Sequence, residues 1–466
     1  MATSRRDFLR TSACALGGVA LASSVESFSI VHALTPQSAT DYKALVCIFL
    51  NGGNDGNNMF VALDQYSSYA TARGVDLAIP QGSLLPVSPI GGGSFGFHPN
   101  MPEIQTLFNQ GRAAVLCNIG PLVEPLTRTT YQNGTGKKPL QLFSHSDQVG
   151  LFATAIANQV AQTGWGGRVA DRTHTLNGAA TFPSNISIAG VNLFLTGVDT
   201  RQLAVADSGT SLANVLQLDN APGASASDIT ARTTSFNQLR TYDNGFTLIK
   251  AASDTRSSAI QTDISLSSVN PILATAFPNT SLGRQLLQIA RLIKACNDPA
   301  AGINMKRQIF FAQIGGFDTH SAQIGGQGSL LTQVSQAMNA FYNATVELGL
   351  QNNITAFTLS DFSRTLQPSG SGPTQVGSDH AWGNNHLIVG GAVLGNRIYG
   401  TYPTLALGGP NDTDGGSSPR GRWIPTTSVE QFAATLATWY GLSSADLTAV
   451  FPLINRFPTP NLGFMM

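Results

Sequence analysis

Four short apolar runs stand out along the chain. Each is rich in Val, Ile, Leu, Phe or Ala, lacks alternation of polar and apolar positions, and is followed by a polar or glycine-rich stretch. A strand covered by helices on both faces of a sheet needs apolar side chains on both sides. The pattern therefore predicts buried strands of a parallel sheet at residues 44–50, 113–119, 308–314 and 354–359.

Stretches between and beside these runs have apolar residues at the three- and four-residue spacing of a helix that buries one face. The first has Pro102 in its first turn and Gly111 after its end, as helices favour. Helices between buried strands are typical of the α/β class, here with a doubly wound, mostly parallel sheet. The predicted helices are residues 102–110, 282–296, 330–350 and 429–440.

The middle of the chain has a different pattern. Residues 193 to about 281 are rich in Ser, Thr, Ala, Asn and Asp and have few strong apolar runs. We expect a largely helical insertion there, within a single domain that spans residues 34–466. Residues 368–373 and 408–421, rich in Gly and Pro, are predicted to be long loops.

The N-terminus has the features of an export signal. A paired arginine in SRRDFLR precedes an uncharged stretch at residues 11–24, which is too short to span a bilayer. The sequence VHA at residues 31–33 predicts a cleavage site, so we expect a signal peptide at residues 1–33. Its S-R-R-x-F-L form resembles the twin-arginine signal, which directs folded proteins to export. We therefore expect a periplasmic or extracellular protein, and no later segment predicts a transmembrane helix.

Charge and cysteine content narrow the partners. Removing residues 1–33 takes away three of the 26 basic and two of the 26 acidic residues, which leaves 23 and 24 and a net charge of −1. Nucleic-acid binding needs a basic surface, so we expect no nucleic-acid partner. Three cysteines remain once Cys14 is removed, an odd number without paired spacing, which predicts buried thiols rather than disulfides or a zinc site. The sequence does not indicate an oligomeric state.

Aspartates and histidines gather where the predicted strands end. Asp55 follows the first run, Asp318 and His320 follow the third, and Asp361 and Arg364 follow the fourth. In an open α/β sheet, ligands bind beyond the carboxyl ends of the strands. We therefore expect these side chains to share one site.

The stretch SDHAWGNNH, residues 378–386, adds Asp379, His380 and His386 before another apolar run at 387–393. Neutral imidazoles and carboxylates bind zinc and manganese, and carboxylates with amide carbonyls suit calcium or magnesium. The sequence therefore predicts a site for divalent metal ions, with zinc, manganese and calcium as candidates. Each residue alone also has a structural interpretation, such as a turn for Asp55 or a loop contact for either histidine.

Several segments, in chain order, resemble a widespread bacterial family of exported proteins known as domain of unknown function 1501. They are the N-terminal signal, FLNGGNDGNN, FHPNM, GGFDTH, SDFSRT, GSDHAWGNNH and RGRWIPTTSVEQFAATLATWYGL, and the resemblance covers nearly the whole mature chain. That family is similar to the alkaline-phosphatase-like superfamily of phosphatases, sulfatases and cofactor-independent phosphoglycerate mutases. The resemblance implies a doubly wound sheet, a two-metal site, and a Ser, Thr or modified Cys nucleophile at a helix start.

By this resemblance, Asp55 matches the aspartate after the first strand that binds one metal. Asp318 and His320 match an Asp and His pair after a later strand, although the superfamily usually spaces the pair four residues apart and here the spacing is two.

The same resemblance matches Asp361 to the aspartate of an S-D-H segment, whose histidine is replaced here by Phe362. That replacement puts the number of metals in doubt. His380 or His386 matches the last histidine ligand, and Asp379 is either a further ligand or a group that orients an imidazole.

Ser144 is the first candidate nucleophile and Ser146 the second. Both lie in FSHSDQ, before an apolar helical stretch at residues 149–160, where the helix dipole and a metal would activate a hydroxyl. A serine followed by Asp and Gln is equally the pattern of an ordinary helix cap. Arg364 is predicted to clamp an oxyanion or phosphate, with a structural salt bridge as the alternative.

Two short motifs compete with this interpretation. GGSFG around Ser94 matches a nucleophile elbow, and glycines at 91, 93 and 96 match G-x-G-x-x-G, but both motifs need a strand before and a helix directly after. Prolines precede and FHP follows, so we expect a Gly-rich hairpin or loop. DTDGG from Asp412 begins like a calcium loop, yet the twelfth position is Trp423 rather than Glu.

The sequence therefore predicts an exported, metal-dependent hydrolase that acts on phosphate or sulfate esters of small molecules or glycans. The main alternative is a non-catalytic binding or structural protein on the same fold. A serine esterase that uses Ser94 is a third interpretation, and it would need no metal.

Overall fold

The computed structural model describes residues 39–180, 182–209, 225–241, 250, 253, 271–299, 302–372 and 374–466. The predicted signal peptide and part of the predicted insertion lie outside these residues, so the proposed domain boundaries stay predictions. Within the insertion, the structure describes strand β7 and helix α8 (Ala226–Thr241).

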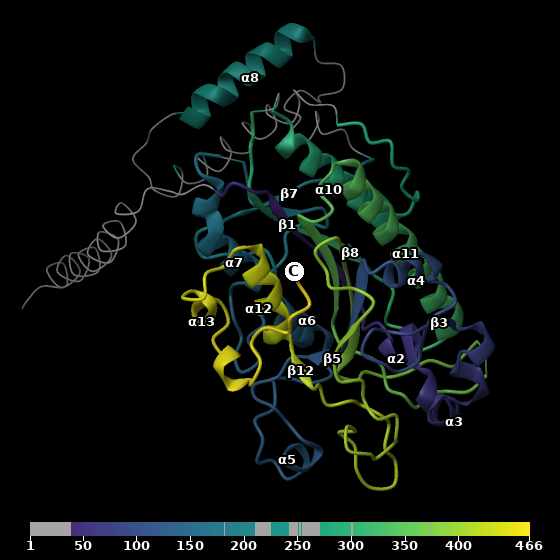
Figure 1. Ribbon diagram of the computed structural model, residues 1–466. Coiled ribbons are helices and arrows are strands. Elements are labelled where there is room, and N and C mark those ends of the chain that lie inside the picture. The colour runs from purple at the N-terminus through teal and green to yellow at the C-terminus, as the bar shows by residue number, and fades with distance from the viewer. Residues whose placement is uncertain are drawn as a thin grey trace, which may run out of the picture.

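A nine-stranded sheet forms the centre of the fold (Figure 1). It has the order β11-β5-β10-β9-β1-β8-β6-β7, and β12 also pairs with β5. The strands are β1 (Lys43–Leu50), β5 (Ala113–Gly120), β6 (Asn185–Ser187), β7 (Gln202–Ala204), β8 (Arg307–Ile314), β9 (Ile354–Ser360), β10 (Asn384–Gly390), β11 (Ile398–Gly400) and β12 (Thr427–Ser428).

The predicted, mostly parallel sheet is confirmed, and one strand, β10, runs in the opposite direction. Strand β1 pairs in parallel with β8 and β9, and β10 runs antiparallel between β9 and β5. Because β10 is antiparallel to both β9 and β5, those two strands are parallel to each other. The four predicted strands therefore all point the same way. Their carboxyl ends therefore lie at one edge of the sheet, where a shared site was expected.

Helices cover both faces, and β1 shows why its sequence is apolar throughout. Val46 and Ile48 belong to one core cluster with helices α4 (Pro102–Asn109), α10 (Ser281–Asn297) and α11 (Gln323–Glu347). Cys47 and Phe49 belong to the opposite cluster with α6 (His145–Thr154), α7 (Trp165–Thr173) and α12 (Val429–Tyr440). Figure 1 shows the two helical layers on either side of the sheet. Successive side chains of a strand face opposite layers, so both must be apolar.

Local signals explain where the helices start. Ser428 caps α12 and Gln431 completes a capping box, which places the helix at the predicted residues 429–440. Helix α11 begins at Gln323, seven residues before the predicted start at 330. Its first turns contain Gly325, Gly326 and Gly328, which are poor helix formers and hide the true start from a pattern-based prediction.

A small antiparallel sheet lies beside the large one and consists of β2 (Phe60–Ala62), β3 (Leu85–Val87) and β4 (Phe95–Phe97). Ser94 is exposed in the connection between β3 and β4, and no helix follows β4 directly. GGSFG therefore lies in a Gly-rich hairpin, one of the two predicted alternatives, and the strand-to-helix turn that a nucleophile elbow requires is not formed there.

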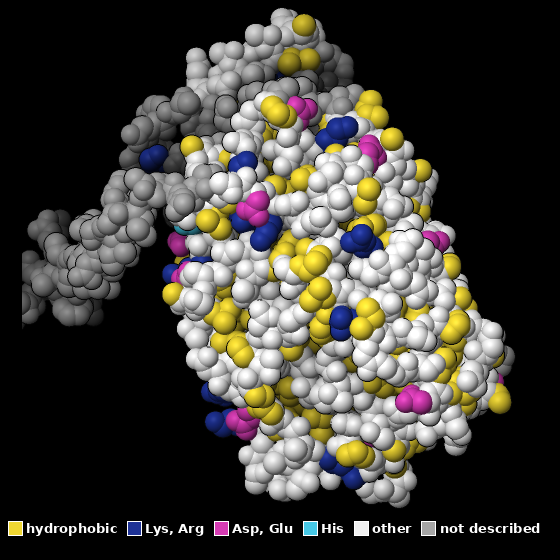
Figure 2. All heavy atoms as spheres, in the orientation of Figure 1, with side chains coloured by type: hydrophobic (Ala, Val, Ile, Leu, Met, Phe, Trp, Pro, Cys, Tyr) yellow, Lys and Arg dark blue, Asp and Glu magenta, His cyan; other side chains and the backbone are white. Residues whose placement is uncertain are grey.

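Short elements complete the described fold. They are α2 (Gly56–Met59), α3 (Tyr66–Leu77), α5 (Arg128–Gln132), α13 (Leu447–Val450) and the 3₁₀ helices Leu63–Gln65, Gln81–Ser83, His174–Asn177 and Ile454–Arg456. The three described cysteines are buried and unpaired, as expected. Among the helices of the described residues, none is long and apolar enough to cross a membrane. Charged side chains lie scattered over the face in Figure 2, as expected for a chain with 11% charged residues.

Candidate metal centre

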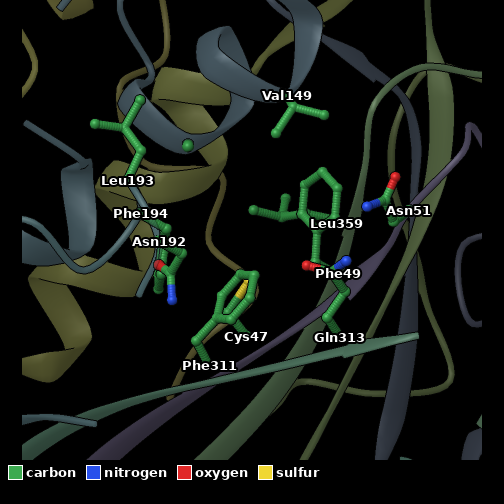
Figure 3. Close-up of a pocket in the computed structure, with 11 residues that line it drawn as sticks. Cys47, Phe49, Asn51, Val149, Asn192, Leu193, Phe194, Phe311, Gln313 and Leu359 are labelled. Atoms are coloured by element: carbon green, nitrogen blue, oxygen red, sulfur yellow. The ribbon is translucent and has the colours of Figure 1, made fainter. Parts of the chain in front are cut away.

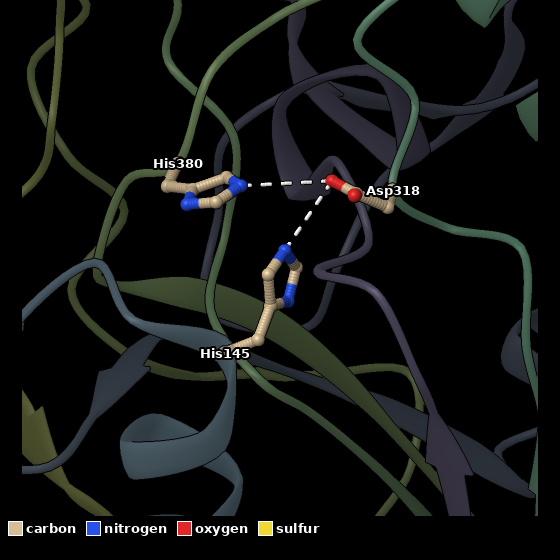
Figure 4. A group of neighbouring side chains, drawn as sticks. All are labelled: His145, Asp318 and His380. Carbon is tan, nitrogen blue, oxygen red and sulfur yellow. Dashed lines mark ion pairs between the residues drawn. The ribbon is translucent and has the colours of Figure 1, made fainter.

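The side chains predicted from strand ends do meet beyond the carboxyl edge of the sheet. Asp318 follows β8, Asp361 follows β9, and His380 lies in the loop before β10. A residue that the sequence analysis did not single out joins them: His145, the first residue of α6. Figure 4 shows His145 and His380 both directed at the Asp318 carboxylate.

Backbone geometry brings these loops together. Gly52, after β1, has a φ of 113°, and a Cβ there would lie 2.4 Å from the amide nitrogen of Asp318. Only glycine permits both this conformation and this approach. The segment after β9 pairs with SDHAWGNNH through a bridge between Arg364 and His380. This pairing explains why residues that are far apart in the sequence share one site.

The tautomer of His145 is set by a buried carboxylate. Its Nδ1 lies 2.8 Å from Oδ2 of Asp361, which is fully buried and also accepts a hydrogen bond from the Gly52 amide at 2.9 Å. Nδ1 therefore carries the hydrogen, which leaves Nε2 with a free lone pair. Nε2 is buried, has no hydrogen-bond partner, and faces Oδ1 of Asp318 at 3.4 Å.

His380 is held in the same way by the backbone. Its Nδ1 donates to the carbonyl of Phe143 at 2.8 Å, so its Nε2 lone pair faces Asp318 Oδ1 at 3.6 Å. Phe143 has a φ of 73°, in the left-handed region, in the turn directly before α6. Burial lowers the pKa of His380 by more than the bond to Phe143 raises it, and this favours a neutral imidazole.

His320 completes a set of three imidazoles. Its Nδ1 lies 3.3 Å from Oδ1 of Asp379, and its Nε2 lies 3.1 Å from Asp318 and 3.0 Å from Nε2 of His380. Burial raises the pKa of Asp379, but the charge of Arg420 at 2.7 Å and the contact with His320 outweigh it and hold that pKa below its usual value. Asp379 therefore lies against the imidazole of His320, and its role in a metal site stays a prediction.

Three potential ligand atoms converge on one point. The ligand atoms of His145, Asp318 and His380 all lie within 4.8 Å of one another, and His320 lies alongside. Two imidazole lone pairs and a carboxylate directed at one point repel each other unless a proton or metal ion lies between them. The orphaned Nε2 of His145 is the clearest sign that these residues suit a metal.

Arg364 supplies a fixed positive charge beside the centre. Its fully buried guanidinium donates from Nε to the Gly53 carbonyl at 2.9 Å and from Nη1 to the Ser378 carbonyl at 3.0 Å. Nη2 donates to the Gly52 carbonyl and to Asp318. Burial raises the pKa of Asp318, but the hydrogen bond and the charge of Arg364 hold it below its usual value.

Phe362 stands where the superfamily pattern has a histidine, and it forms an apolar floor. Its ring centroid lies 4.7 Å from that of His145 and 4.6 Å from that of His380. Packing against a buried aromatic ring restricts the rotation of both imidazoles. The replacement removes one potential ligand and supports the orientation of two others.

Asp55 and His386 are not brought into this cluster. Asp55 is buried and engaged by an ion pair with Arg73 at 2.6 Å, the Gln323 amide and the Asn57 backbone. His386 lies within β10, fully buried, with neither ring nitrogen hydrogen-bonded, and burial lowers its pKa to about 3. Its ring packs edge-on against Phe152 in the core.

Ser144 is the N-cap residue of α6, next to His145. Its hydroxyl donates to Oδ2 of Asp147 at 2.6 Å and does not cap the helix backbone. Ser146 is exposed, with its hydroxyl 3.3 Å from that of Ser144. Of the two candidates, Ser144 therefore has a carboxylate placed to accept its proton.

Comparisons with known proteins agree with the sequence resemblance. The sequence model of a family described as Protein of unknown function (DUF1501) matches residues 42–413. The comparison with curated proteins gave no match. One similar solved structure is Ps i-CgsB in complex with k-i-k-neocarrahexaose, at 9% identity, with 90% of this chain and 78% of that chain covered and a TM-score of 0.34.

Two further solved structures are similar at the same low level. The PsFucS1 sulfatase from Pseudoalteromonas sp. has 9% identity, with 95% of this chain and 73% of that chain covered and a TM-score of 0.31. A TAB5 alkaline phosphatase has 10% identity, with 75% and 91% covered and a TM-score of 0.24.

Proposed function

The chain belongs to the DUF1501 family, and we propose that it is an exported, metal-dependent hydrolase that acts on phosphate or sulfate esters. The observation that carries this proposal is the buried, unpartnered Nε2 of His145 facing the Asp318 carboxylate. The core histidine His386 also lacks hydrogen bonds, but its ring packs against Phe152, whereas Nε2 of His145 faces a carboxylate and a second imidazole lies beside it.

The donor set favours a transition metal. His145, His320 and His380 would present neutral imidazole nitrogens, and Asp318 would add one carboxylate oxygen. Imidazoles suit zinc and manganese, whereas calcium prefers oxygen ligands. Asp361 and Asp379 would hold the imidazoles from behind through Nδ1, an arrangement that orients histidine ligands and raises their basicity.

The reaction we propose is attack on the ester by Ser144. A divalent ion in this centre would supply Lewis acidity at the reacting group. The chain's own residues would do the rest: the Asp147 carboxylate accepts the hydroxyl proton of Ser144, 2.6 Å away. The fixed charge of Arg364 favours an anionic group at the site and stabilises charge as it develops.

The proposed export route bears on when the metal is bound. We propose that the paired-arginine signal at residues 1–33 directs the chain through the twin-arginine pathway to the periplasm or beyond. That pathway moves folded proteins, so the metal would be bound before export. The ester would then come from small molecules or glycans outside the cytoplasm.

A non-catalytic, metal-stabilised protein is the second candidate. One observation favours it: the Asp55 carboxylate, which was predicted to be a ligand, is paired with Arg73. A metal in the same centre would then stabilise the loops after β8 and β9 without chemistry.

Metal content and ester hydrolysis test the proposal together. Protein matured through its own export pathway is compared with His145→Ala and Ser144→Ala, and with His174→Ala, an exposed histidine outside the site, as the matched control. We expect the wild type and His174→Ala to contain stoichiometric zinc or manganese and to hydrolyse 4-nitrophenyl phosphate or sulfate. His145→Ala should lose the metal, and Ser144→Ala should keep the metal and lose hydrolysis.

The other outcomes separate the candidates. Full metal content in His145→Ala would refute the centre. Metal in the wild type without hydrolysis of either ester would refute the enzyme and leave the metal-stabilised protein.

A further inference from the structure

A pocket lies between helix α6 and the sheet (Figure 3). Phe49 and Leu359 form part of its floor from β1 and β9, and Val149 and Ala153 line it from α6. Phe194 closes one side from a neighbouring loop. Most of these side chains are buried and apolar, so the pocket wall offers water few hydrogen bonds.

Three polar side chains line this wall, and one of them, Asn192, is hydrogen-bonded to Ser187 and to the Leu195 amide. The side-chain amides of Asn51 and Gln313 line the pocket and are only partly buried. Neither amide has a hydrogen bond among the described residues. An apolar pocket with a few free polar groups is the usual composition of a small-molecule site, since the polar groups set the orientation of the ligand.

The pocket adjoins the metal centre through three of its lining residues. Val149 lies one helical turn after His145 on α6, which places the two side chains on the same face, roughly 6 Å apart at Cβ. Leu359 lies two residues before Asp361, and Asn51 directly precedes Gly52, whose amide binds Asp361. These links place part of the pocket wall about one helical turn from the centre along α6.

We infer that this pocket binds the apolar part of the substrate, an aryl or short branched alkyl group next to the reacting ester. The inference rests on the proposed function. It narrows the substrate class from esters in general to esters of phenols or apolar alcohols. Sugars are disfavoured in the pocket, because burying their hydroxyls against apolar walls without partners costs free energy.

Two kinds of probe test the pocket separately from the centre. Toluene, followed by ligand-observed NMR on chelator-treated protein, reports on the pocket alone. Phenylphosphonate and methylphosphonate, measured by calorimetry on metal-loaded protein, report on the pocket and the centre together. Val149→Phe fills the pocket from α6, and Leu193→Phe fills it from the opposite loop. Val160→Phe is the matched control, because Val160 is exposed and outside the pocket.

We expect toluene to bind the wild type and Val160→Phe and to be lost in both pocket variants. Phenylphosphonate should bind the wild type about tenfold or more tightly than methylphosphonate, since each buried methylene is worth about that factor in an apolar pocket. The ratio should fall towards one in Val149→Phe and Leu193→Phe. The ratio of the two phosphonate affinities in the wild type tests the pocket without any variant, so this test remains valid even if a filled pocket prevents folding.

Failure of this inference and failure of the proposed function give different results. Equal affinities for the two phosphonates, or no toluene binding in the wild type, would overturn the pocket assignment whatever the metal content. Toluene binding that is lost in the pocket variants, with neither phosphonate bound, would support the apolar site while refuting the anionic ester as substrate.

Discussion

Replacing His386 by leucine should make the protein less sensitive to acid. His386 is fully buried in β10, neither ring nitrogen has a hydrogen bond, and burial lowers its pKa from 6.5 to about 3. Above pH 6.5 the imidazole is neutral in both the folded and the unfolded chain. As the pH falls below 6.5 the unfolded chain binds a proton that the folded chain cannot accept until about pH 3, so stability is lost.

The size of this effect follows from the two pKa values. At pH 5 the pH lies about 1.5 units below the pKa of 6.5 that the imidazole has in the unfolded chain. Each unit stabilises the protonated, unfolded chain by about 1.4 kcal/mol. His386 therefore costs the wild type about 2 kcal/mol of unfolding free energy between pH 8 and pH 5. Leucine has no titrating group and fits an apolar core, so it removes this loss.

Urea unfolding at pH 8 and pH 5 in the presence of chelator measures the effect. The quantity of interest is the drop in unfolding free energy from pH 8 to pH 5, compared between the wild type and His386→Leu, because all other titrating groups then cancel. His174→Leu, at an exposed histidine, controls for the loss of an ordinary imidazole. Equal drops in the wild type and in His386→Leu would refute the reasoning, and loss of metal from His386→Leu would place His386 in the centre.

Two further predictions concern the carboxylates around the site. Asp361→Asn removes the negative charge behind His145 and leaves one acceptor oxygen for two donors, the Gly52 amide and Nδ1 of His145, so metal affinity should fall about 10- to 100-fold in a competition titration with a chromogenic chelator. An unchanged affinity would show that Asp361 does not orient the ligand. Arg73→Met leaves the Asp55 carboxylate buried without its partner, which should lower the unfolding free energy by about 3–5 kcal/mol. Adding Asp55→Asn should restore most of the lost unfolding free energy. A double variant as unstable as Arg73→Met alone would contradict this account.

The sequence was sufficient for the frame of the fold because that frame depends on local pattern. Strands that are covered by helices on both faces of a sheet must be apolar on both sides, and the four apolar runs are strands of the sheet. The direction of β10 could not be predicted, because an apolar run of this length has the same pattern in either orientation. Its start was also hidden: Asn384 and Asn385 are polar, yet both are buried and bond the backbone of distant loops.

The site was predictable as far as strand ends determine it. Asp318, Asp361 and His380 were expected there, and the structure brings them together. His145 was missed because its significance depends on Asp361, 216 residues away, and nothing in FSHSDQ distinguishes a ligand from a cap residue. Asp55, which was predicted from its position after a strand, lies outside the cluster, where its carboxylate pairs with the buried Arg73, 18 residues later.

The balance of charge around the centre favours a single metal ion. Three carboxylates, Asp318, Asp361 and Asp379, face two guanidiniums, Arg364 and Arg420, so the group carries a net charge of −1 while its imidazoles are neutral. One divalent ion would bring that charge to +1, which attracts an anionic ester. A second divalent ion would bring it to +3 in a partly buried site and would have to displace a guanidinium that already binds Asp318. In the proposed one-metal centre, the guanidinium of Arg364 would supply the second positive charge beside Asp318.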